Sequence, residues 1–128
     1  MKTIKVLIAE DEKAIREMYA TVFMREQFTV YTAVDGKSAI EKFKTKKPDI
    51  VLLDIMMPDV TGYVVLKEIR KKHDKYTPVI MLTNLNMEHF TKHDSVDRID
   101  EYLIKSNFTP AEVVGKTKEI LKLNKLMD

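Results

Sequence analysis

Residues 50–62 read IVLLDIMMPDVTG, a wholly apolar run that stops at a carboxylate and continues into a loop with Pro and Gly. A short apolar run bounded by turn signals predicts a strand at Ile50–Leu53 that is buried on both faces. Strands of this kind belong to parallel sheets, because helices cover both faces of such sheets. The next segment carries Val65, Leu66 and Ile69 at helical spacing, which predicts an amphipathic helix directly after the loop.

The same strand–helix unit recurs on both sides of this stretch. Four more apolar runs predict strands at Ile4–Ala9, Phe28–Ala33, Val79–Leu82 and Tyr102–Ile104. Helical patterns follow them, weakest at residues 86–97 and strongest after Thr109, which we expect to cap the last helix together with Glu112. Five such units predict a doubly wound α/β fold, (βα)5, with a five-stranded parallel sheet and helices on both faces.

Composition limits the class of protein. The chain has 128 residues, which is one domain of ordinary size. Its 22 basic and 20 acidic residues give a net charge of +2, which does not favour direct nucleic-acid binding. No apolar run approaches the roughly 20 residues of a membrane span, and no signal peptide is evident, so we expect a cytoplasmic protein. The absence of cysteine excludes disulfides, thiol catalysis and thiolate zinc sites.

Polar side chains stand where four of the predicted strands end. They are Glu10 and Asp11, Asp54, Thr83 and Lys105. Each alone is explained as a helix cap, a loop residue or a solvated lysine, but ligands of doubly wound sheets bind at this edge. Three carboxylates need a cation, and an all-oxygen set favours Mg²⁺. A carboxylate beside that ion can accept a phosphoryl group, whose oxygens a lysine and a threonine can bind.

Four segments in this order and spacing resemble the receiver domain of bacterial two-component response regulators, over about residues 3–124. They are VLIAEDE at 6–12, DIMMPDVTG at 54–62, MLT at 81–83 and YLIK at 102–105. The resemblance implies a flavodoxin-like receiver fold and makes Asp54 the phosphoacceptor. It also implies that Glu10 and Asp11 hold Mg²⁺, with the backbone carbonyl of Met56 completing the protein ligands.

The resemblance extends to the activated state and to partners. Lys105 would bind the phosphoryl group, and Thr83 and Tyr102 would form the switch that responds to it. The phosphoryl donor would be a histidine kinase or a phosphotransfer protein. A downstream protein would bind the surface made by the helix at 86–97, strand Tyr102–Ile104 and the last helix. Whether the domain also forms a homodimer through this surface on phosphorylation stays open.

The five units fill nearly the whole chain, so we expect a receiver domain over residues 1–128 with no output domain. We therefore do not expect an enzyme, beyond self-phosphorylation from phosphohistidine and slow self-dephosphorylation. The expectation of slow self-dephosphorylation rests on Met56 and Leu85, which lie two residues after Asp54 and Thr83 respectively. In receivers these positions flank the phosphoryl group, and apolar side chains there cannot orient a hydrolytic water.

Three further positions depart from the family pattern. Ser106 replaces a proline that is usually cis, and a cis bond without proline costs about 2.5–4 kcal/mol, so we expect a trans bond and a shifted loop at 106–108. Asn84 replaces a small residue and is expected to hinder the coupling of Thr83 to Tyr102. Glu10 replaces the commoner aspartate, which is a milder change.

Other functions fit the pattern less well. A flavodoxin would need a hydroxyl- and glycine-rich phosphate loop where residues 10–12 are all acidic. An aspartate-nucleophile phosphatase usually has a second carboxylate, the general acid, two residues after the nucleophile, but this chain has Met56 at that position. A degenerate receiver that binds proteins without phosphorylation stays open as the alternative. The pair His89 and His93 is interpreted as surface rather than zinc site, and the basic runs at 42–47 and 70–75 as helix ends that complement the helix dipole.

Overall fold

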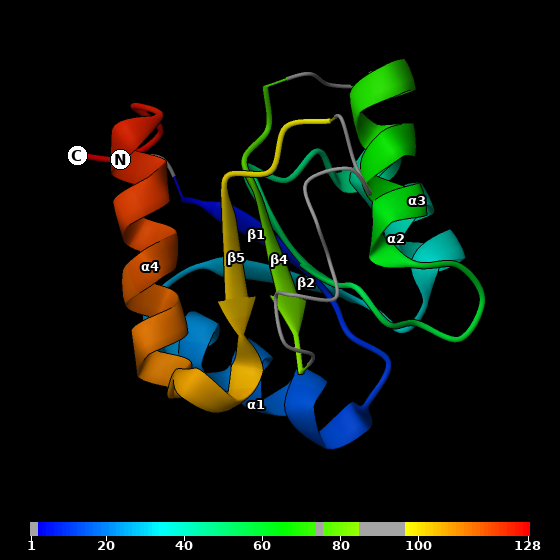
Figure 1. The fold of residues 1–128 in the computed structure, drawn as a ribbon. Coiled ribbons are helices and arrows are strands. Elements are labelled where there is room, and N and C mark those ends of the chain that lie inside the picture. The colour runs from blue at the N-terminus through cyan, green and yellow to red at the C-terminus, as the bar shows by residue number, and fades with distance from the viewer. Residues whose placement is uncertain (1–2, 74–75, 85–96) are drawn as a thin grey trace.

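The computed structural model describes residues 3–73, 76–84 and 97–128 (Figure 1). The strands are β1 (Lys5–Ala9), β2 (Thr29–Ala33), β3 (Ile50–Asp54), β4 (Val79–Thr83) and β5 (Glu101–Ile104). The helices are α1 (Lys13–Arg25), α2 (Gly36–Lys46), α3 (Gly62–Glu68) and α4 (Pro110–Leu123). A π-helical turn at Ile69–His73 extends α3, and a 3₁₀ turn at Lys105–Asn107 follows β5.

All five strands are parallel, in the order β2-β1-β3-β4-β5. This order reverses direction after β2, as in a doubly wound sheet, so the predicted fold class is confirmed. Figure 1 shows α1 and α4 on one side of the sheet and α2 and α3 on the other. Every residue of β3 and β4 is buried, as expected of central strands covered on both faces.

Alternation along the strands divides the core into two layers. In β1, Val6 and Ile8 pack with α1 and α4, whereas Leu7 and Ala9 pack with α2 and α3. Burying one Val, Leu or Ile side chain contributes about 1.5–3 kcal/mol, so the two layers supply most of the stabilisation. This rigid sheet fixes the positions of the residues at its carboxyl edge.

The strand boundaries differ from the sequence-based prediction by one residue at several ends. Ile4 and Phe28 are buried but precede their strands. Asp54 and Thr83 lie inside β3 and β4, because each pairs with a residue of the neighbouring strand. The predicted helix at 86–97, with His89 and His93, falls mainly on residues 85–96, which lie outside the described residues.

The expected cap of the last helix and the expected trans bond after Lys105 are confirmed, while the expected shift of the loop at 106–108 stays a prediction. Thr109 accepts a hydrogen bond from the Glu112 amide at 3.1 Å, and Glu112 accepts one from the Thr109 amide at 2.9 Å, which makes the expected capping box. All peptide bonds within the described residues are trans, and this includes the bond between Lys105 and Ser106.

None of the helices in residues 3–73, 76–84 and 97–128 has the length and apolar character to cross a membrane.

Candidate functional site

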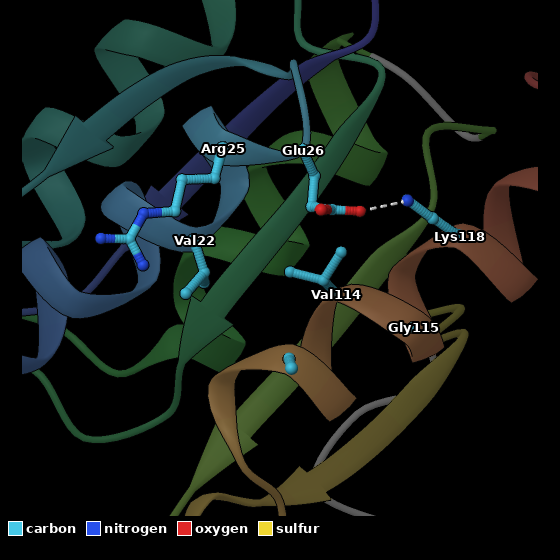
Figure 2. Close-up of a pocket in the computed structure, with 7 residues that line it drawn as sticks. Val22, Arg25, Glu26, Val114, Gly115 and Lys118 are labelled. Atoms are coloured by element: carbon cyan, nitrogen blue, oxygen red, sulfur yellow. Dashed lines mark hydrogen bonds and ion pairs between the residues drawn. The ribbon is translucent and has the colours of Figure 1, made fainter.

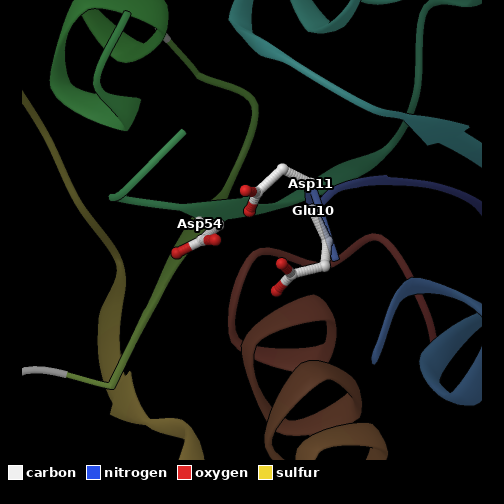
Figure 3. Close-up of side chains that lie close together, drawn as sticks. All are labelled: Glu10, Asp11 and Asp54. Carbon is white, nitrogen blue, oxygen red and sulfur yellow. The ribbon is translucent and has the colours of Figure 1, made fainter. Parts of the chain in front are cut away.

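Three carboxylates meet at the carboxyl edge of the sheet (Figure 3). Glu10 and Asp11 follow β1, and Asp54 ends β3, which lies beside β1 with Ala9 opposite Leu53. One carboxylate oxygen from each residue lies within 4.8 Å of the others. Glu10 and Asp54 are buried, and Asp11 is exposed. A set of three hard oxygen donors this close together suits a small divalent cation such as Mg²⁺.

Lys105, directly after β5, reaches into this cluster even though serine replaces the usual proline after it. Its Nζ forms an ion pair with Glu10 Oε1 and lies 3.3 Å from Asp54 Oδ2. The Lys105 side chain is only 7% exposed. Burial works to lower its pKa, but the hydrogen bonds to Glu10 and Asp54 and the charges of both carboxylates together outweigh burial and raise the pKa. Lys105 is therefore a fixed positive charge shared by two buried carboxylates.

The sharing leaves the buried cluster with one negative charge too many. Burial, assisted by the charge of Glu10, raises the pKa of Asp54 from 3.8 to about 7. The charge of Lys105 and the Met56 amide, which donates to Asp54 Oδ1 at 3.2 Å, oppose this rise. A cation at the three carboxylates would favour the ionised form of Asp54, the form that can act as a nucleophile.

Arg16 on the first turns of α1 fixes the loop that carries the acidic pair. Its Nη1 donates to the carbonyl oxygens of Glu10 at 2.9 Å and Asp11 at 3.2 Å. The Glu12 amide donates to Glu10 Oε2 at 3.1 Å, so both oxygens of Glu10 have protein partners. Sequence reasoning did not find Arg16, although a cation one turn after an acidic pair is a usable signal.

The loop after β3 begins with a close backbone approach. The Gly62 amide donates to the Ile55 carbonyl at 2.8 Å, and a Cβ on Gly62 would lie 2.5 Å from the Asp54 carbonyl oxygen. Only glycine fits here, which explains the last position of the 54–62 motif. The Met56 side chain is 56% exposed beside the cluster. That its carbonyl binds metal stays a prediction.

The switch candidates lie on two neighbouring strands. Thr83, fully buried, ends β4 opposite Ile104, the residue before Lys105. Tyr102 pairs with Met81 and so shares a sheet face with Thr83, since alternate residues point to the same side. The Tyr102 hydroxyl lies 3.2 Å from the hydroxyl of Tyr63 on α3, a contact that sequence reasoning missed.

The two remaining candidates lie at the end of β4. Asn84 is exposed and is the last residue of the described stretch 76–84. Leu85 lies outside the described residues. The predicted effect of Asn84 on switching and the predicted role of Leu85 in hydrolysis therefore stay predictions.

A separate groove lies between α1 and α4, with a cavity of about 270 Å³ (Figure 2). Its lining residues are Val22, Arg25, Glu26, Ala111, Val114, Gly115 and Lys118. An ion pair joins Glu26 and Lys118 at 2.6 Å. None of the predicted site residues lines this groove, and its walls are mainly apolar. We therefore place the chemistry at the acidic cluster and not in this groove.

Comparison with known proteins decides the family. A profile of the "Response regulator receiver domain" family matches residues 6–118. The chain belongs to this family. It is 40% identical to "Probable transcriptional regulator ycf27" of Guillardia theta over 92% of this chain and 45% of that protein. The receiver spans about half the length of the curated relatives it matches.

Solved structures agree with the fold of the receiver. The response regulator TrrA from Thermotoga maritima, solved in complex with Mg²⁺ and BeF, is 35% identical, with a TM-score of 0.83 over 93% of this chain and 100% of that one. The chemotaxis response regulator CheY4 of Vibrio cholerae is 28% identical, with a TM-score of 0.84 over 94% of this chain and 100% of that one. The acidic cluster of this receiver fits the Mg²⁺ site of the family.

Proposed function

We propose that Asp54 accepts a phosphoryl group from the phosphohistidine of a histidine kinase or phosphotransfer protein. One observation carries the proposal: the buried Asp54 carboxylate lies 3.3 Å from the Lys105 ammonium and, with two further carboxylates, forms a cluster that could hold a metal ion. An oxygen of Asp54 forms a bond to phosphorus as the bond between phosphorus and the histidine nitrogen breaks, and the imidazole leaves with the electron pair. Apart from this transfer and the slow hydrolysis of its product, we propose no enzymatic activity.

Several residues prepare this step. Lys105 provides a positive charge for the oxygens of the incoming group, and it is already held 3.3 Å from Asp54 Oδ2. The Met56 amide holds the other carboxylate oxygen, which fixes the direction of attack. Mg²⁺, bound by Asp11, Asp54 and the Met56 carbonyl with Glu10 nearby, would neutralise charge on the transferred group.

The response would pass through Thr83 and Tyr102. Thr83 would donate its hydroxyl hydrogen bond to the phosphoryl group, which biases the position of Tyr102 on the neighbouring strand. In the structure the Tyr102 hydroxyl contacts Tyr63, and this contact would break as the ring moves. The changed surface of β5 and α4, together with the predicted helix at 86–97, would bind a downstream protein or a second copy of the receiver.

Phosphorylation is tested directly by incubating the protein with acetyl phosphate and Mg²⁺ and measuring the intact mass. We expect a gain of one phosphoryl group that is lost in Asp54→Ala and without Mg²⁺. Glu119→Ala, which removes an exposed carboxylate of α4, is the matched control and should gain the group normally. No gain in the unmodified protein would favour the degenerate receiver that binds partners without phosphorylation.

We also propose that the phosphoryl group is lost slowly, because the exposed Met56 side chain beside Asp54 offers no polar atom to orient water. The double variant Met56→Asn with Leu85→Glu should shorten the lifetime of the phosphoryl group, followed by intact mass after removal of acetyl phosphate. Glu119→Ala should leave that lifetime unchanged. An unchanged lifetime in the double variant would remove the reason for expecting slow hydrolysis.

A further inference from the structure

Asp59, in the loop between β3 and α3, binds the start of a different helix. Its Oδ1 accepts a hydrogen bond from the Gly36 amide, and its Oδ2 accepts one from the Lys37 amide, each at 2.8 Å. The Val60 amide also donates to Oδ1 at 2.8 Å. One side chain therefore ties the loop that follows the phosphoacceptor to the first turn of α2, 22 and 23 residues away in sequence.

The start of α2 has a second carboxylate with a different task. Asp35 is its N-cap, accepts the Ser38 amide at 2.8 Å and forms a capping box with that residue. The first amides of a helix have no partner within the helix. Asp35 satisfies the third of them, whereas Asp59 satisfies the two before it. These backbone donors, Gly36 above all, lower the pKa of Asp59, so it stays ionised near neutral pH.

The loop and α2 also pack too closely for most side chains. A Cβ on Gly36 would lie 2.3 Å from Val60 Cγ2 and 3.3 Å from Asp59 Oδ1. A side chain at position 36 would force Val60 to move, so glycine suits this helix start, against which the loop side chains pack. On the other side of the loop, Met57 is buried in the core. The loop thus has one apolar anchor in the core and one polar anchor, Asp59, on the helix.

We propose that Asp59 is a positioning residue for the phosphoacceptor site. By holding the loop on α2, it fixes the backbone of Met56, whose amide binds Asp54 and whose carbonyl is the expected metal ligand. The part of this inference that concerns Mg²⁺ rests on the proposed function. Partners that orient metal ligands typically change metal affinity by about 10–100-fold when removed, and we expect the lower end of that range because Met57 remains in place.

The test compares Asp59→Ala with Asp35→Ala, since both remove a carboxylate that caps α2 but only Asp59 belongs to the loop. The Mg²⁺ dissociation constant is measured by calorimetry, and thermal stability and amide hydrogen exchange without metal are measured in parallel. Both variants should unfold at a lower temperature. Only Asp59→Ala should weaken Mg²⁺ binding, by about tenfold, and speed exchange of the Met56 amide. Asp59→Asn, which keeps one acceptor oxygen, should have an Mg²⁺ dissociation constant between those of Asp59→Ala and the unmodified protein.

Equal weakening of Mg²⁺ binding in Asp59→Ala and Asp35→Ala would overturn the proposal, because the effect would then come from α2 stability alone. An unchanged dissociation constant and unchanged Met56 exchange in Asp59→Ala would overturn it as well. If the unmodified protein binds no Mg²⁺, the proposed function fails, and hydrogen exchange decides the positioning role alone. Faster Met56 exchange confined to Asp59→Ala would then support it, and equal exchange in the two variants would refute it.

Discussion

The two ends of the sheet each bury a cluster of charged groups, and the clusters differ in how their charges balance. At the amino end, the Arg70 guanidinium donates to the Thr77 carbonyl at 2.5 Å and twice to the Arg98 carbonyl, at 3.1 and 2.9 Å. Asp100 Oδ1 lies 3.7 Å from Arg70 Nη2, and it also accepts a hydrogen bond from the Val79 amide. Among the described residues, the buried charges of this cluster are the Arg70 guanidinium and the Asp100 carboxylate, while the Arg98 guanidinium that also pairs with Asp100 is exposed to solvent.

At the carboxyl end, two buried carboxylates share the single ammonium of Lys105. Removing one partner from a balanced buried cluster is strongly destabilising, whereas an unbalanced cluster already carries an uncompensated charge that costs stability and is typical of functional sites. The difference indicates that the amino-end cluster serves structure. The carboxyl-end cluster holds a surplus negative charge that a bound divalent cation would balance. Removing one charge from either cluster tests this difference.

The largest expected effect comes from Arg70→Met. The substitution removes the Arg70 hydrogen bonds to the carbonyls of Thr77 and Arg98 and takes the buried cation away from Asp100, so we expect a loss of about 3–5 kcal/mol in the free energy of unfolding. Urea denaturation measures this loss. Mg²⁺ binding by the folded fraction should not change, because Arg70 lies at the opposite end of the sheet. A loss below about 1 kcal/mol would mean that the cluster is not structural.

Asp54→Asn should raise the free energy of unfolding, whereas Arg70→Met should lower it. The substitution removes the surplus charge and leaves Glu10 and Lys105 as a balanced pair, while the amide oxygen can still accept the Met56 hydrogen bond. Without Mg²⁺ at pH 8, we expect a gain of about 1–2 kcal/mol in the free energy of unfolding, together with complete loss of phosphorylation. Destabilisation by this variant would contradict the charge imbalance.

The gain in the free energy of unfolding of Asp54→Asn should increase with pH. The folded-state pKa of Asp54 is raised from 3.8 to about 7, so between these values the folded protein binds a proton that the unfolded chain has released. The contribution of Asp54 to the free energy of unfolding therefore falls as pH rises from about 4 to 7 and is constant above. The stability difference between Asp54→Asn and the unmodified protein should grow over the same interval in EDTA.

The sequence predicted the carboxyl-end site because its members share one simple property. Glu10, Asp54, Thr83 and Lys105 each lie at or just after the end of a strand, and parallel strands bring their carboxyl ends to one edge. The apolar runs that mark the strands are therefore enough to predict that these side chains gather at one edge of the sheet. Strand boundaries were less predictable, because pairing with a neighbour decided whether Asp54 and Thr83 belong to the strands.

The amino-end cluster was not predicted, because Arg70 was interpreted only as part of a basic helix end that complements the helix dipole. Its partners are backbone carbonyls, one of them 28 residues away, and any residue type can supply a carbonyl. The same reason hid the role of Asp59, whose partners are backbone amides of α2. Contacts to backbone groups across the fold leave no residue pattern, so they need the structure.

The smallest expected effect belongs to Arg98→Gln, which removes the same charge as Arg70→Met from the same cluster. The Arg98 side chain lies 2.8 Å from Asp100 Oδ2, but it is 41% exposed. Its backbone carbonyl, which binds Arg70, is unaffected by the substitution. We expect a loss below about 1 kcal/mol that shrinks further in 0.5 M salt, as measured by urea denaturation. Similar losses in Arg98→Gln and Arg70→Met would show that net charge controls this end of the sheet. A large difference would show that burial does, and burial together with imbalance is what distinguishes the carboxyl-end cluster as a site.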